Sequence, residues 1–277
     1  MNRTEHAIYE VDQLHMLAMR DQWMNRIHPL VKFVLTLLYL VATISFHKYD
    51  VMGLLGMMVY PLALFLLGDL SFRDSLYRLR FVLPLVFLMG IFNPFFDTNR
   101  IVLGGATYSA GWLSMVTLIL KGCFCIFASY ALIATTTIEE ICYALRMLHV
   151  PKVLVNQFLL TYRYISLFLG EVHRTTQAYH LRAPKQKGIH ISAWGSLVGQ
   201  MLLRCIDRAS EVYESMVLRG YHGEFYLQRK TASGDGSDSG GITAADLVYA
   251  FLWLAVIVLF RIFPVLVWIG NLTRGMI

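Results

Sequence analysis

Long apolar runs separated by short polar connections dominate the first half of the chain, and one more run lies near its end. Each run is close to or above the roughly 18 to 20 apolar residues that a helix needs to cross about 30 Å of hydrocarbon. The pattern therefore predicts an all-α, polytopic membrane protein with about five transmembrane helices. The predicted spans are 29–46, 51–68, 81–96, 112–134 and 245–269.

The pattern changes at residue 135, where charged side chains begin to interrupt every window long enough to cross a bilayer. We expect this region to lie in the cytoplasm and to contain long amphipathic helices. A run rich in glycine, serine and aspartate follows it and is typical of a flexible tether. The predicted segments are a cytoplasmic N-terminal segment 1–28, a four-helix membrane region 29–134, the cytoplasmic region 135–230, a flexible linker 231–244 and a final membrane helix 245–277.

The distribution of positive charge predicts the orientation in the membrane. Arg73, Arg78 and Arg80 follow the second span, so this connection should face the cytoplasm. Five spans then place the N-terminus inside and the C-terminus outside, in a bacterial inner membrane. The net charge of +6 is spread among the apolar segments, so we expect the lipid bilayer, and no nucleic acid, as a partner.

The first cytoplasmic helix has an apolar face that begins at Leu154 and ends at Arg182. Apolar positions along it recur in alternating steps of four and three, which is the spacing of one helix face. Pro184 removes a backbone donor and disfavours helical geometry in the residue before it. The sequence therefore predicts that Arg182 lies on the last turn of this helix.

The second cytoplasmic helix follows the same plan. Its apolar positions lead from Leu202 through Tyr213 to Met216, and Arg219 and Gly220 come next. Glycine is the usual left-handed residue after a helix, so the helix should end there. On its polar side we expect two i,i+3 ion pairs, Arg204 with Asp207 and Arg208 with Glu211.

The two terminal arginines have two possible roles. A cation on the last turn of a helix interacts favourably with the macrodipole and the unpaired carbonyls, a local effect of about 0.3 to 1 kcal/mol. A guanidinium at the tip of an apolar ridge can instead pair bidentately with a carboxylate in a partner's groove. The second reading makes Arg182 and Arg219 docking residues.

The sequence resembles the transmembrane T component of energy-coupling factor transporters, in particular the cobalt/nickel, CbiQ-like branch. The similarity is most specific in RASEVYESMVLRGYHGEF and in two short signatures that stand where the family has Ala-Arg-Gly. HPLVK at the start of the first span is similar to the His-Pro-x-x-Lys of the family. The two signatures are Leu181, Arg182 and Ala183, and Leu218, Arg219 and Gly220.

The resemblance implies a scaffold that catalyses nothing itself. Two coupling helices would place Arg182 and Arg219 on a dimer of ATP-binding-cassette ATPases, which bind the ATP and Mg, with Arg208 and Glu211 holding the second helix. Their motion would pass to a separate substrate-binding, CbiM-like S component in the membrane, and a small accessory membrane subunit is a further partner of such transporters. The cargo implied is cobalt, as used in cobalamin biosynthesis, or nickel. A vitamin importer is the alternative.

Other candidate chemistry is sparse. The chain has no GxxxxGK[ST] phosphate loop, so we expect the ATPase on another chain. Lys121, inside the fourth span, is either a substrate-gating residue of an autonomous carrier or a structural lysine that reaches backbone carbonyls. No metal site or bound cofactor is expected. We interpret four histidines as solvated or interfacial side chains, namely His173, His180, His190 and His222. We interpret the four cysteines as small apolar fillers, namely Cys123, Cys125, Cys142 and Cys205.

Overall fold

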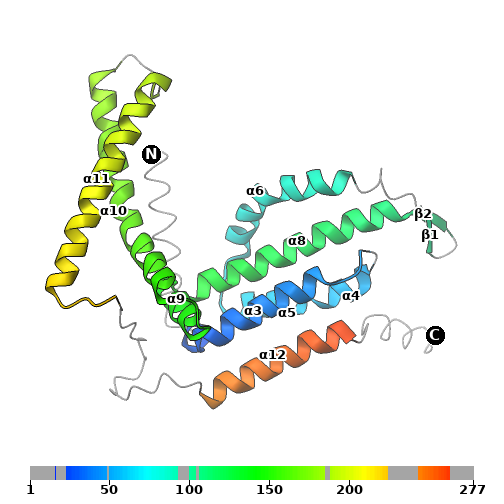
Figure 1. Ribbon diagram of the computed structural model, residues 1–277. Coiled ribbons are helices and arrows are strands. Elements are labelled where there is room, and N and C mark those ends of the chain that lie inside the picture. Colours follow the sequence, from blue (N-terminus) through cyan, green and yellow to red (C-terminus); the bar gives the residue numbers. More distant parts are fainter. Residues whose placement is uncertain are drawn as a thin grey trace. The chain divides into compact units, whose positions relative to one another are not determined.

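A computed structural model describes most of the chain (Figure 1). Its residues form two compact units, which we call the bundle unit (23–137 and 243–262) and the arm unit (138–223). Residues 1–15 and 17–22 of the N-terminal segment, most of the predicted linker, and the end of the last predicted span with Pro264 lie outside the described residues. The structure describes residues 16, 23–48, 50–92, 100–103, 106–184, 188–223 and 243–262.

The bundle unit is built around one long central helix, α8, which contacts α3, α4, α5 and α6, while α12 packs on α3 and α4. The predicted span 112–134 corresponds to α8. The elements are α2 (Trp23–Arg26), α3 (Pro29–Ile44), α4 (Val51–Gly56), α5 (Val59–Leu67), α6 (Phe72–Ile91), β1 (Arg100–Leu103), β2 (Ala106–Ser109), α8 (Ala110–Thr135) and α12 (Ala244–Ile262).

The bundle unit has the polarity of a membrane protein. Large apolar side chains cover its outside, among them Val41, Leu66 and Phe251, while Lys32 and Asp246 are buried inside. This distribution suits helices surrounded by lipid, where polar groups find partners within the bundle. Two helices, over Gly111–Thr135 and Ala244–Arg261, are long and apolar enough to cross a membrane, and the apolar helices Pro29–Ile44 and Val51–Leu67 are shorter.

The predicted single helix 51–68 is broken into α4 and α5. Pro61 lacks the N–H that would bond to the carbonyl of Met57 one turn earlier. The Tyr39 hydroxyl donates to that carbonyl oxygen at 2.9 Å, and the Tyr39 ring is fully buried. A side chain from a neighbouring helix thus satisfies the backbone group that proline leaves open, as apolar surroundings require.

Two further predictions about this unit need correction. The arginine-containing connection before residue 81 is helical, because α6 already begins at Phe72. The polar loop between the third and fourth spans contains an antiparallel hairpin, in which Arg100 pairs with Ser109 and Leu103 with Ala106. The fold is helical, as predicted, with this one small sheet among the described residues.

Lys32, in the first turn of α3, lies inside the bundle unit. It is buried, and its Nζ donates to the carbonyl oxygen of Thr135, the last residue of α8, at 3.0 Å. Nearby, Asp246 accepts from the backbone N–H of His28 at 2.8 Å and of Thr243 at 2.9 Å. These bonds join the ends of α3, α8 and α12.

The arm unit consists of α9 (Ile138–Met147), α10 (Lys152–Arg182) and α11 (Ile191–Leu218). α9 packs on α10, and the elbow between them buries Cys142, Ala144 and Val155. His149, in the left-handed conformation with φ 62°, and Pro151 redirect the chain between the two helices. With 31 residues, α10 is about 46 Å long.

Candidate functional site

Arg182 is the last residue of α10. Ala183 follows as the C-cap, with φ −128°, and its N–H donates to the carbonyl of Tyr179 at 3.0 Å. Pro184 then prevents a further helical turn. The predicted position of Arg182 on the last turn of its helix is thereby confirmed.

Arg219 is the C-cap of α11, and a Schellman motif ends the helix there. Gly220 has φ +83°, its N–H donates to the carbonyl of Val217 at 2.9 Å, and the N–H of Tyr221 donates to that of Met216 at 2.9 Å. This pair of bonds defines the motif, and glycine adopts the left-handed conformation without the cost of a Cβ. The predicted glycine stop is therefore confirmed.

Each arginine is next to a leucine that almost nothing covers. Leu181 is 84% exposed and Leu218 is 87% exposed. Both arginines are also exposed, with Ala183 partly covered and Gly220 open to solvent. The macrodipole effect applies at both helix ends, but it does not account for an exposed apolar side chain beside each cation.

α10 and α11 form an antiparallel helical hairpin (Figure 1). At its turn, the N–H of His190 donates to the Tyr179 hydroxyl at 3.3 Å. At the opposite end, the Asn156 side chain bonds to residues that follow α11. Arg182 therefore lies at one end of the hairpin and Arg219 at the other, and the 28 residues of α11 separate them by about 40 Å.

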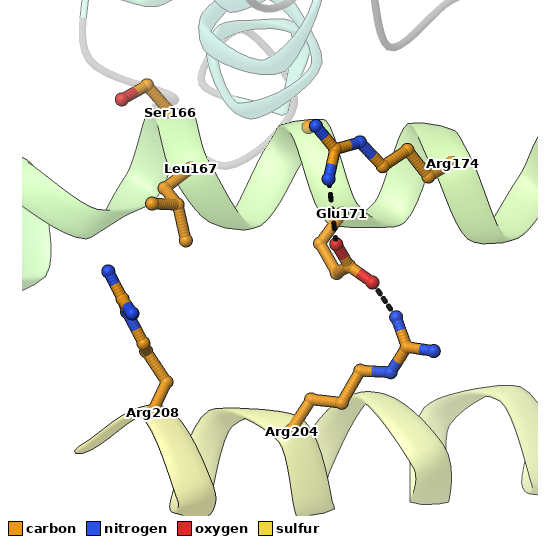
Figure 2. A pocket seen from close by; sticks show the side chains of 7 residues that line it. Ser166, Leu167, Glu171, Arg174, Arg204 and Arg208 are labelled. Carbon is orange, nitrogen blue, oxygen red and sulfur yellow. Dashed lines mark ion pairs between the residues drawn. The ribbon is translucent and has the colours of Figure 1, made fainter. Parts of the chain in front are cut away.

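An ion pair between Glu171 and Arg204 joins the middle of the two helices (Figure 2). Arg204 thus pairs across the hairpin, and the expected pairing with Asp207 on its own helix is wrong. Arg174 approaches the same carboxylate at 3.9 Å from one turn further along α10. Because Glu171 is 26% exposed and Arg204 49%, we estimate the contribution of the pair to stability at about 0.2 to 1 kcal/mol.

The second predicted pair is present. Arg208 Nη1 and Glu211 Oε2 lie 3.2 Å apart on the exposed surface of α11. An open pocket of about 520 Å³ separates the two helices beside these charges (Figure 2), so the middle of the hairpin is held by polar contacts and not by dense apolar packing. The pocket is lined by Ser166, Leu167, Gly170, Glu171, Arg174, Arg204 and Arg208.

Lys121, in α8, reaches backbone carbonyls. Its Nζ donates to the carbonyl oxygen of Ile44, at 3.0 Å, and to that of Phe46. Arg261 donates to the carbonyl oxygen of Ser45 at 3.3 Å, and its guanidinium lies 4.8 Å from the centre of the Phe46 ring. Both cations thus satisfy carbonyls at the C-terminal end of α3, where positive charge is favourable.

The histidines and cysteines do not gather into a site. Within the described ranges, no three histidine, cysteine or acidic side chains lie close enough to hold a metal ion. His190 caps α11, its Nδ1 accepting from the N–H of Ser192, and His173 bonds to Gln177. Cys142 is buried, but Cys205 is exposed, so the interpretation of every cysteine as an apolar filler is wrong for Cys205.

Two residues of the arm unit have roles that sequence reasoning missed. They are Asn156 and Glu171, for which the sequence predicted no partner. Asn156 is only 8% exposed and binds residues beyond α11, and Glu171 binds Arg204 across the hairpin. The spacing of apolar residues within one helix contains no information on such partners. The antiparallel arrangement of two long helices joined by a short turn is the signal that would have placed them opposite each other.

The fold defines the chain as a helical membrane protein with a helical arm unit that exposes two arginine-bearing ends. Residues 20–231 match the CbiQ family, described as cobalt transport protein, and the chain belongs to this family. This is a family of transport proteins, and the apolar helices of the bundle unit suit a membrane component.

A relative is found in Methanocaldococcus jannaschii, the uncharacterized protein MJ1571. The two sequences are 26% identical over 117 residues, which is 41% of this chain. The matched part spans 40% of the relative's length.

Proposed function

We propose that this chain is the transmembrane T component of an ATP-driven energy-coupling factor importer. In this role the arm unit docks on a dimer of ATP-binding-cassette ATPases, which bind the ATP and Mg. The movement of the ATPases passes through the α10–α11 hairpin to a separate substrate-binding membrane subunit. The chain itself carries out no catalysis.

The arrangement of the two arginine-bearing ends supports this proposal most directly. Arg182 and Arg219 each end a long helix, each has an exposed leucine beside it, and they lie at opposite ends of one hairpin. A separation of about 40 Å suits two grooves on two copies of a partner subunit. A guanidinium at each end provides bidentate hydrogen bonding to a carboxylate or to carbonyls in such a groove.

Further features fit a docking surface. Ala183 and Gly220 follow the two arginines and leave room for close approach of a partner. Arg208 and Glu211 would stabilise the exposed face of α11 behind the second end. Among the described residues of the hairpin, α11 has no buried residue, so nearly its whole surface is open to partners.

The predicted topology belongs to the same proposal. Five spans with the N-terminus in the cytoplasm place the arm unit on the cytoplasmic side of a bacterial inner membrane, where ATP is available. The proposal keeps the five predicted segments: a cytoplasmic N-terminal segment, a four-helix membrane region, a cytoplasmic region, a flexible linker and a final membrane helix. Their bounds are 1–28, 29–134, 135–230, 231–244 and 245–277. The linker would allow the last helix, 245–277, to rejoin the bundle unit after the arm.

We infer cobalt or nickel ions as the cargo, since the chain belongs to a cobalt transport family. A CbiM-like S component in the membrane would capture the ion, with a small accessory membrane subunit as a further partner. The import would serve cobalamin biosynthesis or a nickel enzyme. A vitamin importer with the same architecture is the alternative, decided by identifying the membrane protein that copurifies.

The docking role is tested by reversing both charges, Arg182→Glu and Arg219→Glu, in the assembled transporter. We expect membrane insertion to be unchanged and the ATPases to be lost from the purified complex. A matched control reverses two exposed charges elsewhere on α10, Lys152→Glu and Arg163→Glu, with the same change in net charge. If the ATPases stay bound to the Arg182/Arg219 variant and uptake is normal, the docking assignment is wrong.

A further inference from the structure

Asn156 makes a long-range contact with the chain just beyond Arg219. Its Nδ2 donates to the carbonyl oxygen of Gly223 at 3.0 Å and to the hydroxyl of Tyr221 at 3.2 Å. Asn156 is 8% exposed, and the bonds join positions 65 and 67 residues apart in the sequence. A primary amide has two N–H donors, and both have a partner here.

The elbow of the arm unit holds Asn156 in place. Val155, next to it, is 1% exposed, and α9 packs against this first part of α10. α9 begins three residues after the end of α8, so the elbow is the part of the arm unit nearest along the chain to the bundle unit. A buried side chain on a packed helix has little rotational freedom, and it therefore makes a firm anchor.

Two glycines bring the other partner to this anchor. Gly220 has φ +83° and Gly223 has φ +91°, a region that other residues rarely adopt. The first glycine ends α11 in the Schellman motif, and the second lies where the chain offers its carbonyl to Asn156. The spacing of the two glycines in RGYHG is thus explained by a turn that begins at Arg219 and ends on the elbow.

The end that carries Arg182 is held differently. It lies 26 positions beyond Asn156 on α10, about 39 Å from the anchor. Near it, Tyr179 accepts from the N–H of Ala183 through its carbonyl oxygen and from the N–H of His190 through its hydroxyl, both within the turn of the hairpin. One arginine-bearing end is therefore fixed near the elbow and the other lies at the far end of a long helix.

We propose that Asn156 is a positioning residue that clamps the Arg219 turn to the elbow between α9 and α10. The two docking ends are then mechanically unequal: the Arg219 end moves with the elbow, and the Arg182 end moves as the tip of a lever. The functional part of this inference rests on the proposed docking role of Arg219, whereas the clamp itself does not.

Limited trypsin digestion of the purified full-length chain tests the clamp, because trypsin cleaves after both arginines. Replacing Asn156 by Asp keeps the size of the side chain but removes both donors. We expect Asn156→Asp and Asn156→Ala to accelerate cleavage after Arg219 by roughly tenfold, since two hydrogen bonds that hold the turn are lost. Cleavage after Arg182, in the same molecules, should keep its rate. Gln157→Ala, at the exposed neighbouring position, is the matched control.

An unchanged rate after Arg219 in Asn156→Asp would overturn the proposal. Equal acceleration at both arginines would also overturn it, because that result means general loosening of the arm unit. Retention of the ATPases in the assembled transporter tests the docking role separately from the clamp. Faster cleavage of the free chain combined with normal retention of the ATPases would confirm the clamp and count against docking through Arg219.

Discussion

Replacing Lys121 by methionine separates the two readings of this intramembrane charge. The substitution keeps a long unbranched side chain and removes the ammonium group. In the structure this group donates to the carbonyl oxygens of Ile44 and Phe46, at the C-terminal end of α3. A structural lysine predicts lower stability with transport preserved, whereas a substrate-gating lysine predicts loss of transport.

The size of the effect follows from these contacts. A hydrogen bond from a charged donor contributes about 1.5 to 3 kcal/mol, and a cation at a helix C-terminus about 0.3 to 1 kcal/mol. Lys121 is partly exposed, and Arg261 still donates to the carbonyl of Ser45 after the change. We therefore expect a loss of stability between the two ranges, about 1 to 2 kcal/mol. Such a loss lowers the Tm by about 2 to 8 °C.

Thermal unfolding in detergent measures the stability, and uptake by the assembled transporter below the Tm of the variant measures transport. Lys121→Arg is the control, because it keeps the positive charge at the same position. We expect uptake within the normal range for both variants and a lower Tm for Lys121→Met. Abolished uptake with an unchanged Tm would refute the structural reading and support an autonomous carrier.

Three further predictions concern the packing of the two units. Tyr39→Phe leaves the Met57 carbonyl without its 2.9 Å bond, and we expect a loss of about 1 to 2 kcal/mol by thermal unfolding; an unchanged Tm would contradict the account of the α4–α5 break. In Gly56→Val, a Cβ would lie 2.5 Å from Phe260 Cδ1, so we expect α4 and α12 to separate at a cost of about 1 to 3 kcal/mol. Gly170→Ala, inside α10 with open space around the added Cβ, should instead stabilise the protein by about 0.4 to 1 kcal/mol in the same assay. Burial, with the nearby Glu139, raises the pKa of the Cys142 thiol, and thiols react with maleimides as thiolates. At pH 7 a maleimide should therefore label exposed Cys205 much faster than Cys142, and the labelling of Cys142 should accelerate as the pH rises. Equal labelling rates would place Cys142 at the surface.

The ends of helices were predictable where one residue determines them. Pro184 ends α10 just after Arg182, and Gly220 ends α11 through its left-handed conformation. The long apolar run 112–134 also predicted α8, since its length and composition leave few alternatives. In these cases the deciding interaction is local, within about one helical turn.

Interactions between distant segments were not predictable in the same way. The carbonyl that Pro61 leaves open at the break after α4 is satisfied by Tyr39, which lies 18 residues earlier in the chain. Arg204 has Asp207 three residues away, so the sequence predicted a local ion pair. In the folded hairpin Arg204 pairs with Glu171 of α10 instead. The role of Asn156 was not predictable because its partners lie 65 and 67 residues further along the chain.

The small sheet had a local signal that a helix-centred reading overlooked. RIVL and ATYS are two short runs separated by two glycines, a typical sequence of a β-hairpin. The stretch between the predicted spans 81–96 and 112–134 was expected only as a connection between membrane helices, and this expectation hid the pattern. The sheet stays small, with four residues in each strand, so the helical class of the fold is unaffected.

The central claim, that this chain transmits work from separate ATPases, is tested most directly by ion uptake into liposomes. Purified chain alone, and chain assembled with its ATPases and S component, are compared with and without ATP in the presence of cobalt ions. We predict uptake only for the complete assembly and only with ATP. Uptake of cobalt by the isolated chain without ATP would contradict the account.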